Sequence, residues 1–221
     1  MSSALIILES ASLTWANYPM KKEFKESDIV SLTPREQIRQ SPQLYFQESF
    51  EAGNINALPF EMLCHAFDEY YDNNCSDISI HLQPDSFVIR YNAGLPLEKG
   101  PDELTKAEAI LTQLFTCHNQ KKHLAVGDEF CRLGLAAVNW ATHRSEFTTV
   151  SKGERAIFRF EEGTLTSKEF SATEEQDHTH IVAQVAPEIF RGLTFEMNGI
   201  HEKIADIRQR FPGLKVEVTG Y

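Results

Sequence analysis

Residues 60–69 read Phe-Glu-Met-Leu-Cys-His-Ala-Phe-Asp-Glu and lie in the most strongly patterned segment of the chain. Between residues 58 and 71, apolar side chains recur at three- and four-residue steps, which predicts an amphipathic helix. Its apolar stripe consists of Leu63, Ala66, Phe67 and Tyr70. Glu61, His65 and Asp68 share another stripe of the same helix. A stripe of ionisable side chains suits either a binding site or a solvated helix face, so the helix alone leaves both readings open.

The segment after this helix predicts a β-hairpin. Ile78, Ile80 and Leu82 alternate with polar residues, and a second run of strand-forming residues, 87–91, follows a short Pro-Asp-Ser turn. The second strand leads into the sequence Arg90-Tyr91-Asn92-Ala93-Gly94-Leu95-Pro96. Glycine and proline so close together indicate a tight turn directly after the strand.

The remaining elements can be assigned from capping residues and periodicity. Thr33, Pro34 and Glu36 form a helix start, with a capping residue, a proline at the first helical position and a glutamate three residues after the cap. The pattern further predicts helices over residues 104–115 and 133–142, a polar loop over 117–129, and strands over 146–150, 156–160 and 179–185. A last helix spans residues 195–207, and a last strand spans 214–218.

This order of elements predicts an α/β (α+β) two-layer sandwich, in which a mixed, mostly antiparallel sheet carries helices on one face. Residues 1–33 have no clear helical or strand pattern and are interpreted as an N-terminal arm, and residues 34–221 as one domain. A chain of 221 residues with 42% hydrophobic side chains is long enough for a sizeable core.

Charge and cysteine usage limit the partners and the compartment. The net charge of -11 opposes direct contact with nucleic acid and leaves a cationic protein as a candidate partner. Four scattered cysteines, without a C-x-x-C pair or an export signal, indicate reduced thiols in the cytoplasm. No apolar run approaches the ~20 residues that span a bilayer, so we expect no membrane contact.

Five segments in sequence order resemble the ATPase domain of the DNA gyrase B protein, a member of the Bergerat-fold (GHKL) superfamily that includes the histidine kinases. Residues 38–46 resemble its opening signature, 60–69 its helix Phe-Glu-Val-Val-Asp-Asn-Ala-Ile-Asp-Glu, and 87–96 its strand and turn ending Asp-x-Gly-x-Gly-Ile-Pro. Residues 127–142 resemble its glycine-rich lid end, and 179–182 its Thr-Gly-Thr strand. The resemblance implies a Bergerat ATP-binding fold.

The resemblance assigns roles to two residues of the first helix. Glu61 matches the general base that activates water for attack on the γ-phosphate, and its alternative reading is a solvated helix-face glutamate. His65 stands where the family has an asparagine that binds Mg²⁺. Because magnesium prefers oxygen ligands, an imidazole there puts metal-dependent hydrolysis in doubt, and a plain helix-surface histidine is the alternative.

Among the other matched positions, Arg90 and Arg132 are altered, whereas Gly94, Leu95, Pro96 and Gly134 keep the family's residues. Arg90 replaces the aspartate that accepts a hydrogen bond from the adenine amino group. A guanidinium only donates hydrogen bonds, so it cannot take over this role. The alternative interpretation of Arg90 is a strand residue whose side chain reaches water. Arg132 replaces a glycine of the phosphate cradle. The family's remaining pocket positions correspond to Gly94, Leu95, Pro96, Gly134, Thr179 and His180.

Other chemical motifs are missing from the sequence. Eight histidines and four cysteines show no zinc-site spacing, and there is no phosphate loop, dinucleotide fingerprint or nucleophile elbow. We therefore predict no metal site.

Three hypotheses remain. The first is a degenerate pseudo-ATPase without a cofactor that acts through protein contacts, as a homodimer through its N-terminal arm or with a gyrase- or topoisomerase-type subunit. The second is an ATP-binding protein or slow ATPase that requires ATP and Mg²⁺ and uses Glu61 as general base. The third is a binder of another small anionic ligand.

Overall fold

The computed structural model describes residues 31–116, 122–124, 130 and 132–220. All of these residues except Ser31 belong to a compact unit that begins at Leu32. The predicted N-terminal arm lies outside the described residues except for its last three, and so does most of the predicted loop over residues 117–129.

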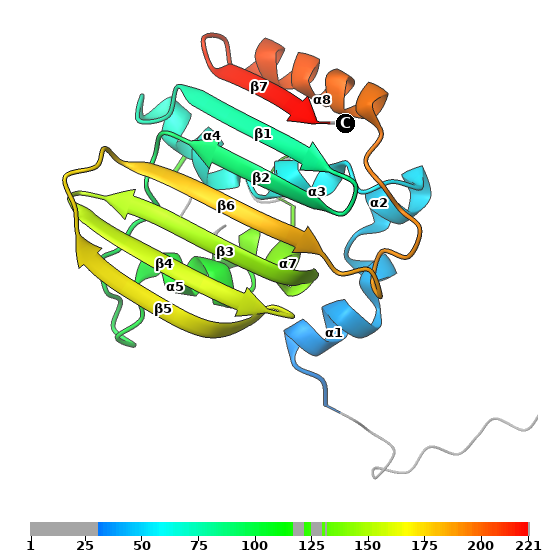
Figure 1. The fold of residues 1–221 in the computed structure, drawn as a ribbon, viewed down its shortest axis with the longest axis horizontal. Helices are drawn as coiled ribbons and strands as arrows, with labels where there is room; N and C mark the ends of the chain where they lie inside the picture. Colours follow the sequence, from blue (N-terminus) through cyan, green and yellow to red (C-terminus); the bar gives the residue numbers. More distant parts are fainter. Residues whose placement is uncertain (1–30, 117–121, 125–129, 131, 221) are drawn as a thin grey trace, which may run out of the picture. The chain divides into compact units, whose positions relative to one another are not determined.

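Short helices and a large sheet make up this unit (Figure 1). The helices are α1 (Pro34–Gln40), the 3-10 helix η3 (Pro42–Leu44), α2 (Gln47–Ala52), α3 (Ala57–Glu61), α4 (Cys64–Tyr71), α5 (Lys106–Thr112), α7 (Leu135–Trp140) and α8 (Met197–Arg210). The strands are β1 (Asp77–Gln83), β2 (Ser86–Tyr91), β3 (Thr142–Ser151), β4 (Glu154–Glu161), β5 (Thr164–Ala172), β6 (His178–Val185) and β7 (Lys215–Gly220).

The seven strands form one sheet in the order β5-β4-β3-β6-β2-β1-β7. Every neighbouring pair is antiparallel except β1 and β7, which run parallel. The helices lie on one face of the sheet, behind it in the view of Figure 1. The prediction of a two-layer sandwich with a mixed, mostly antiparallel sheet is therefore confirmed.

A single hydrophobic core lies between the helices and the sheet. It forms because alternate strand residues face the helices: Ile78, Ile80 and Leu82 in β1 are at most 1% exposed. The stacked rings of Phe67 in α4 and Phe211 after α8, with centroids 4.6 Å apart, bring these two helices together in the same core. The core thus fixes the position of α4, which carries several of the candidate site residues.

The start of the first helix agrees with the prediction from sequence. Thr33 caps α1: its Oγ1 accepts a hydrogen bond from the amide of Glu36, and the Glu36 carboxylate accepts one from the amide of Thr33 at 2.8 Å. Pro34 is the first helical residue. The hydrogen bonds that Thr33 donates to this carboxylate, first from its amide and then from its hydroxyl, lower the pKa of Glu36.

The predicted continuous helix over residues 58–71 is wrong in one respect, because the structure divides it into α3 and α4. At the junction, Met62 and Leu63 have ψ angles of -7° and -2°, and the amide of Leu63 bonds the carbonyl of Phe60, three residues back. Both junction side chains are fully buried in the core. The break changes the direction of the chain between Glu61 and His65.

Two more elements differ from the sequence-based expectation. The predicted helix over residues 104–115 is shorter, since α5 ends at Thr112 and Phe115 has a φ of 63°. Among the strands, β5 has no clear apolar alternation, because it forms the edge of the sheet and most of its residues are exposed. An edge strand of this kind lacks the pattern by which strands are recognised in a sequence.

Candidate functional site

The carboxylate of Glu61 is bound by the backbone directly before α7. Its Oε2 accepts hydrogen bonds from the amides of Arg132 and Leu133, both at 3.1 Å, and from Gly134 at 3.5 Å. Gly134 has a φ of 78° and caps α7, a left-handed conformation that suits glycine. Glu61 is only 6% exposed, which rules out the reading of a solvated helix-face glutamate.

Burial governs the protonation of this carboxyl group. It raises the pKa of Glu61 above the usual value, while the hydrogen bonds from the amides of Leu133 and Gly134, the charge of Arg132 and its amide act in the opposite direction. Desolvation disfavours the charged form, and amide donors favour it. The balance leaves a carboxyl group that gains a proton more readily than an exposed glutamate.

The side chain of Arg132 points away from this carboxylate. Its Nη1 lies 3.3 Å from Oε2 of Glu48 in α2, and Lys203 in α8 lies 2.8 Å from the other Glu48 oxygen. Arg132 therefore contributes its backbone amide to the site, while its guanidinium joins α2.

His65 lies one turn after Glu61, at the start of α4, and is 5% exposed. Its ring centroid lies 6.1 Å from that of Tyr91, the last residue of β2, which is also buried. The reading of His65 as a helix-surface histidine is therefore wrong. The buried imidazole lies at the edge of a cavity between α4 and the turn that follows β2.

The turn over residues 92–96 is held by hydrogen bonds within the protein. Thr149 accepts from the amide of Leu95 at 2.7 Å, and Thr179 donates to the carbonyl of Ala93 at 2.8 Å. Asn92 accepts from the amides of Ser76 and Asp77, both at 2.9 Å. The side chains of Thr179 and Asn92 thus bond the chain itself and hold the turn against its neighbours.

Gly94 brings this turn against the end of β3. A Cβ atom at this position would lie 2.0 Å from the carbonyl oxygen of Val150, a distance that no side chain tolerates. Glycine is thus required for close approach of two backbone segments. Pro96, two residues later, accepts a hydrogen bond from the amide of Ala107 at the start of α5.

Two predicted pocket residues lie on the other face of the sheet. Arg90 is exposed and pairs in register with His180 of β6, whereas the neighbouring pair, Tyr91 and Thr179, faces the helices. The placement of Arg90 and His180 in the pocket is corrected accordingly, because adjacent strand residues point to opposite faces. Burial lowers the pKa of His180, and the charge of Arg90 lowers it further.

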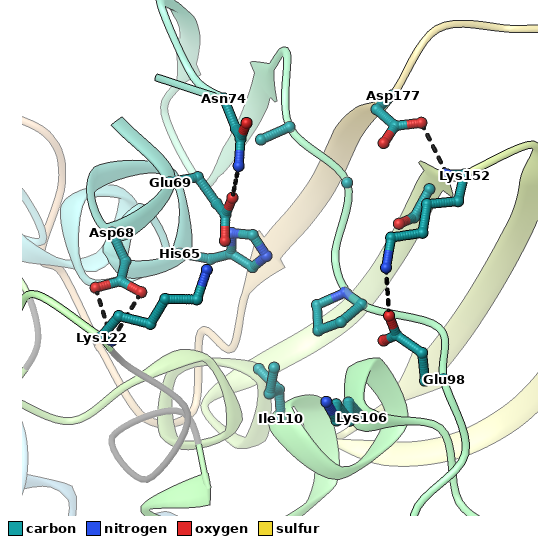
Figure 2. Close-up of a pocket in the computed structure, with 14 residues that line it drawn as sticks. His65, Asp68, Glu69, Asn74, Glu98, Lys106, Ile110, Lys122, Lys152 and Asp177 are labelled. Atoms are coloured by element: carbon teal, nitrogen blue, oxygen red, sulfur yellow. Dashed lines mark hydrogen bonds and ion pairs between the residues drawn. The ribbon is translucent and has the colours of Figure 1, made fainter. Parts of the chain in front are cut away.

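A cavity of about 760 Å³ opens beside His65 (Figure 2). Figure 2 shows Asp68 and Glu69 on one side of it, and Glu98, Lys152 and Asp177 on the other. Gly94 and Pro96 of the turn, with Lys106 and Ile110 of α5, complete much of its lining. The cavity is large enough for a small organic ligand.

The charges around this cavity are largely paired. Lys152 Nζ bonds Glu98 at 2.6 Å, and its amide bonds Asp177 at 2.9 Å. Glu69 accepts from the side-chain amide of Asn74 at 2.7 Å. The lining is therefore polar and mixed in sign.

Asp68 is a site residue whose role the sequence did not indicate. It accepts hydrogen bonds from three successive amides, those of residues 122–124, and is 4% exposed. Its place on the stripe with Glu61 and His65 was the available signal. The sequence did not reveal its partners, which lie more than 50 residues away.

Among the residues that the structure describes, no three or more His, Cys, Asp or Glu side chains come together in a group that could hold a metal ion. Within the same residues, no helix is both long and apolar enough to cross a membrane.

The mostly antiparallel seven-stranded sheet and its helices match the fold of the gyrase B ATPase domain. Among solved structures, the 43K ATPase domain of Thermus thermophilus gyrase B, determined in complex with an aminocoumarin, is similar to this chain with a TM-score of 0.66 and 20% identity. The match covers 84% of this chain and 48% of that one. The predicted resemblance to the gyrase B ATPase domain is thus confirmed for the fold.

The sequence comparisons agree with the fold. The DNA gyrase B protein of Clostridium acetobutylicum is 21% identical over 201 residues, which cover 89% of this chain and 31% of that protein. No family model matches the chain. The chain therefore spans less than a third of the length of this curated relative.

Proposed function

We propose that this chain is a gyrase-B-like pseudo-ATPase domain that acts through protein contacts, with Mg-ATP binding impaired or lost. The observation that carries the proposal is the bond between Glu61 and the amides of residues 132–134. In the family that the sequence resembles, the glutamate activates water and the glycine-rich segment holds phosphate. In this protein the Glu61 carboxylate and the amides of residues 132–134 bind each other. The carboxylate is therefore not available to activate water, and the amides are not available to hold phosphate.

The surroundings of His65 support the same proposal. A buried imidazole packed near the Tyr91 ring offers no oxygen to Mg²⁺, which binds hard oxygen ligands in an octahedron. A phosphate brought to the amides of residues 132–134 would also meet the Glu61 carboxylate. Its negative charge would repel phosphate unless Glu61 were protonated.

Calorimetric titration of the full chain with ATP and Mg²⁺ tests the loss of nucleotide binding. We expect no measurable heat of binding at millimolar ATP, and no thermal stabilisation by ATP or by a non-hydrolysable analogue. The Glu61→Gln variant is the matched control, since it removes the negative charge and keeps an oxygen acceptor. A dissociation constant in the micromolar range for the natural protein would contradict the proposal.

The proposed partner is a second copy of this chain, joined through residues 1–33, or a gyrase- or topoisomerase-type subunit. Light scattering of the full chain should then give twice the monomer mass of 25.1 kDa, or a heavier particle when a gyrase subunit is added. ATP should not change either result. A monomer that does not associate with gyrase subunits would overturn this part of the proposal.

The raised pKa of Glu61 favours a second candidate, an ATP-binding protein or slow ATPase with Glu61 as general base. It requires Mg-ATP-dependent phosphate release that disappears in Glu61→Gln. A third candidate is a binder of another small anion, which would contact the cavity lysines Lys106, Lys122 and Lys152 in competition with Glu98 and Asp72, the carboxylates that bind Lys152 and Lys122. Binding of such an anion without ATP binding would distinguish this candidate.

A further inference from the structure

The carboxylate of Asp68 sits in a nest of three successive backbone amides. Its Oδ1 accepts from the amide of His123 at 2.9 Å and of Leu124 at 3.2 Å, and its Oδ2 accepts from the amide of Lys122 at 3.1 Å. Successive amides that point to one centre form an anion-binding concavity. In this protein the anion in that concavity comes from α4.

One helical turn later, Asp72 binds the side chains of the same segment. Its Oδ1 lies 2.8 Å from Nε2 of His123, and its Oδ2 bonds Nζ of Lys122. The Lys122 bond, followed by the His123 bond, lowers the pKa of Asp72. Asp68 in α4 and Asp72, the residue that ends this helix, thus hold the main chain of residues 122–124 and the side chains of Lys122 and His123.

The core secures both sides of this contact. Leu124 is 7% exposed and belongs to the hydrophobic core, and Phe67 of α4 stacks on Phe211. The ring of His123 lies 5.4 Å from that of Tyr71, whose side chain is 42% exposed. A buried acceptor on a packed helix needs little reorganisation to bind the amides, which favours a stable contact.

We propose that Asp68 is a built-in anion ligand, whose carboxylate occupies the amide nest of residues 122–124 in place of an external oxyanion and fixes this segment on α4. The chemical class that the nest accepts is a carboxylate or a similar small oxyanion. The surface made by Tyr71, Asp72, Lys122 and His123 is then present without any bound ligand.

This inference deepens the proposed function and rests on it for one consequence: the conformation of residues 122–124 does not respond to ATP. If a partner binds to this surface, the binding is constitutive and does not require ATP. The hydrogen bonds of Asp68 stand independently of whether ATP binds elsewhere in the protein.

Hydrogen exchange of the full chain tests the role of Asp68. In the natural protein without nucleotide, the amides of residues 122–124 should exchange at least ~10-fold more slowly than in an unstructured peptide. Asp68→Ala, which removes both acceptor oxygens, should abolish most of this protection, and Asp68→Asn, which keeps one oxygen, should reduce it less. Glu69→Gln, which removes the same charge from the adjacent position, should leave it unchanged. Fast exchange in the natural protein, or full protection in Asp68→Ala, would overturn the inference.

Chemical rescue distinguishes an anion site from an ordinary structural contact. Added formate should restore protection of residues 122–124 in Asp68→Ala, while chloride at equal ionic strength should not; failure of formate removes the oxyanion assignment. If Asp68→Ala does not fold, the same comparison is made in Asp68→Ser, whose short side chain also leaves room for formate. Calorimetric binding of Mg-ATP with intact protection at these residues would refute the proposed function and leave the role of Asp68 standing.

Discussion

The Gly94→Ala variant should lose more than ~3 kcal/mol of unfolding free energy, or fail to accumulate as folded protein. The added Cβ would lie 2.0 Å from the carbonyl oxygen and 2.8 Å from the carbonyl carbon of Val150. Val150 cannot withdraw, because it is fully buried in β3 and paired with Arg155 on one side and His178 on the other. The turn over residues 92–96 would therefore have to leave β3.

Gly53→Ala is the matched control for this substitution. Gly53 has a φ of 73°, yet nothing lies within 4 Å of the position of its Cβ, so alanine there should cost only about 1 kcal/mol from backbone strain. Urea unfolding followed by circular dichroism compares the two variants with the natural protein. A Gly94→Ala variant that loses no more than about 1 kcal/mol, as expected for the control, would show that the turn can move.

Glu61→Ala should be the second most damaging change, costing about 2–5 kcal/mol. Removal of the carboxylate leaves the amides of Arg132, Leu133 and Gly134 without their acceptor beside the buried start of α7. Glu61→Gln keeps an oxygen at the same place and should cost much less. Equal losses in the two variants would mean that the charge, and not the acceptor, holds this segment.

The pH dependence of the Glu61 contribution follows from its raised pKa. An acid whose pKa is higher in the folded state stabilises the fold most below its unfolded value, near 4.5, and loses that contribution as the pH rises through the folded pKa. The stability of Glu61→Gln relative to the natural protein should therefore increase as the pH rises from 4.5 through the folded pKa of Glu61. A relative stability that falls over this range would show that the amide bonds outweigh burial.

The elements with local signals could be predicted from the sequence. The capping residues of α1, the β1–β2 hairpin and the amphipathic stripe of α4 depend on neighbouring residues, and all three lie where the patterns indicated. The fold class followed from their order. The break between α3 and α4 could not be predicted, because Met62 and Leu63 continue the helical pattern and the surrounding core determines their backbone angles.

The site was only partly predictable, for two physical reasons. A shift of one residue moves a strand side chain to the opposite face of the sheet. The alignment of motifs therefore placed Arg90 in the pocket, whereas in the structure it is the next residue, Tyr91, that faces the helices. The bonds of Glu61 and Asp68 join residues more than 50 positions apart. Contacts over such separations leave no periodic pattern in a single sequence.

The parallel pairing of β7 with β1 has a consequence for synthesis of the chain. His81 and Thr219 lie side by side in the sheet but are separated by 138 positions. While the chain emerges from the ribosome, β1 can pair with β2 early, but its other edge stays open until β7 has been made. An open strand edge is a site of wrong association. Until β7 has been made, the nascent protein therefore keeps this edge of β1 open to association with other strands.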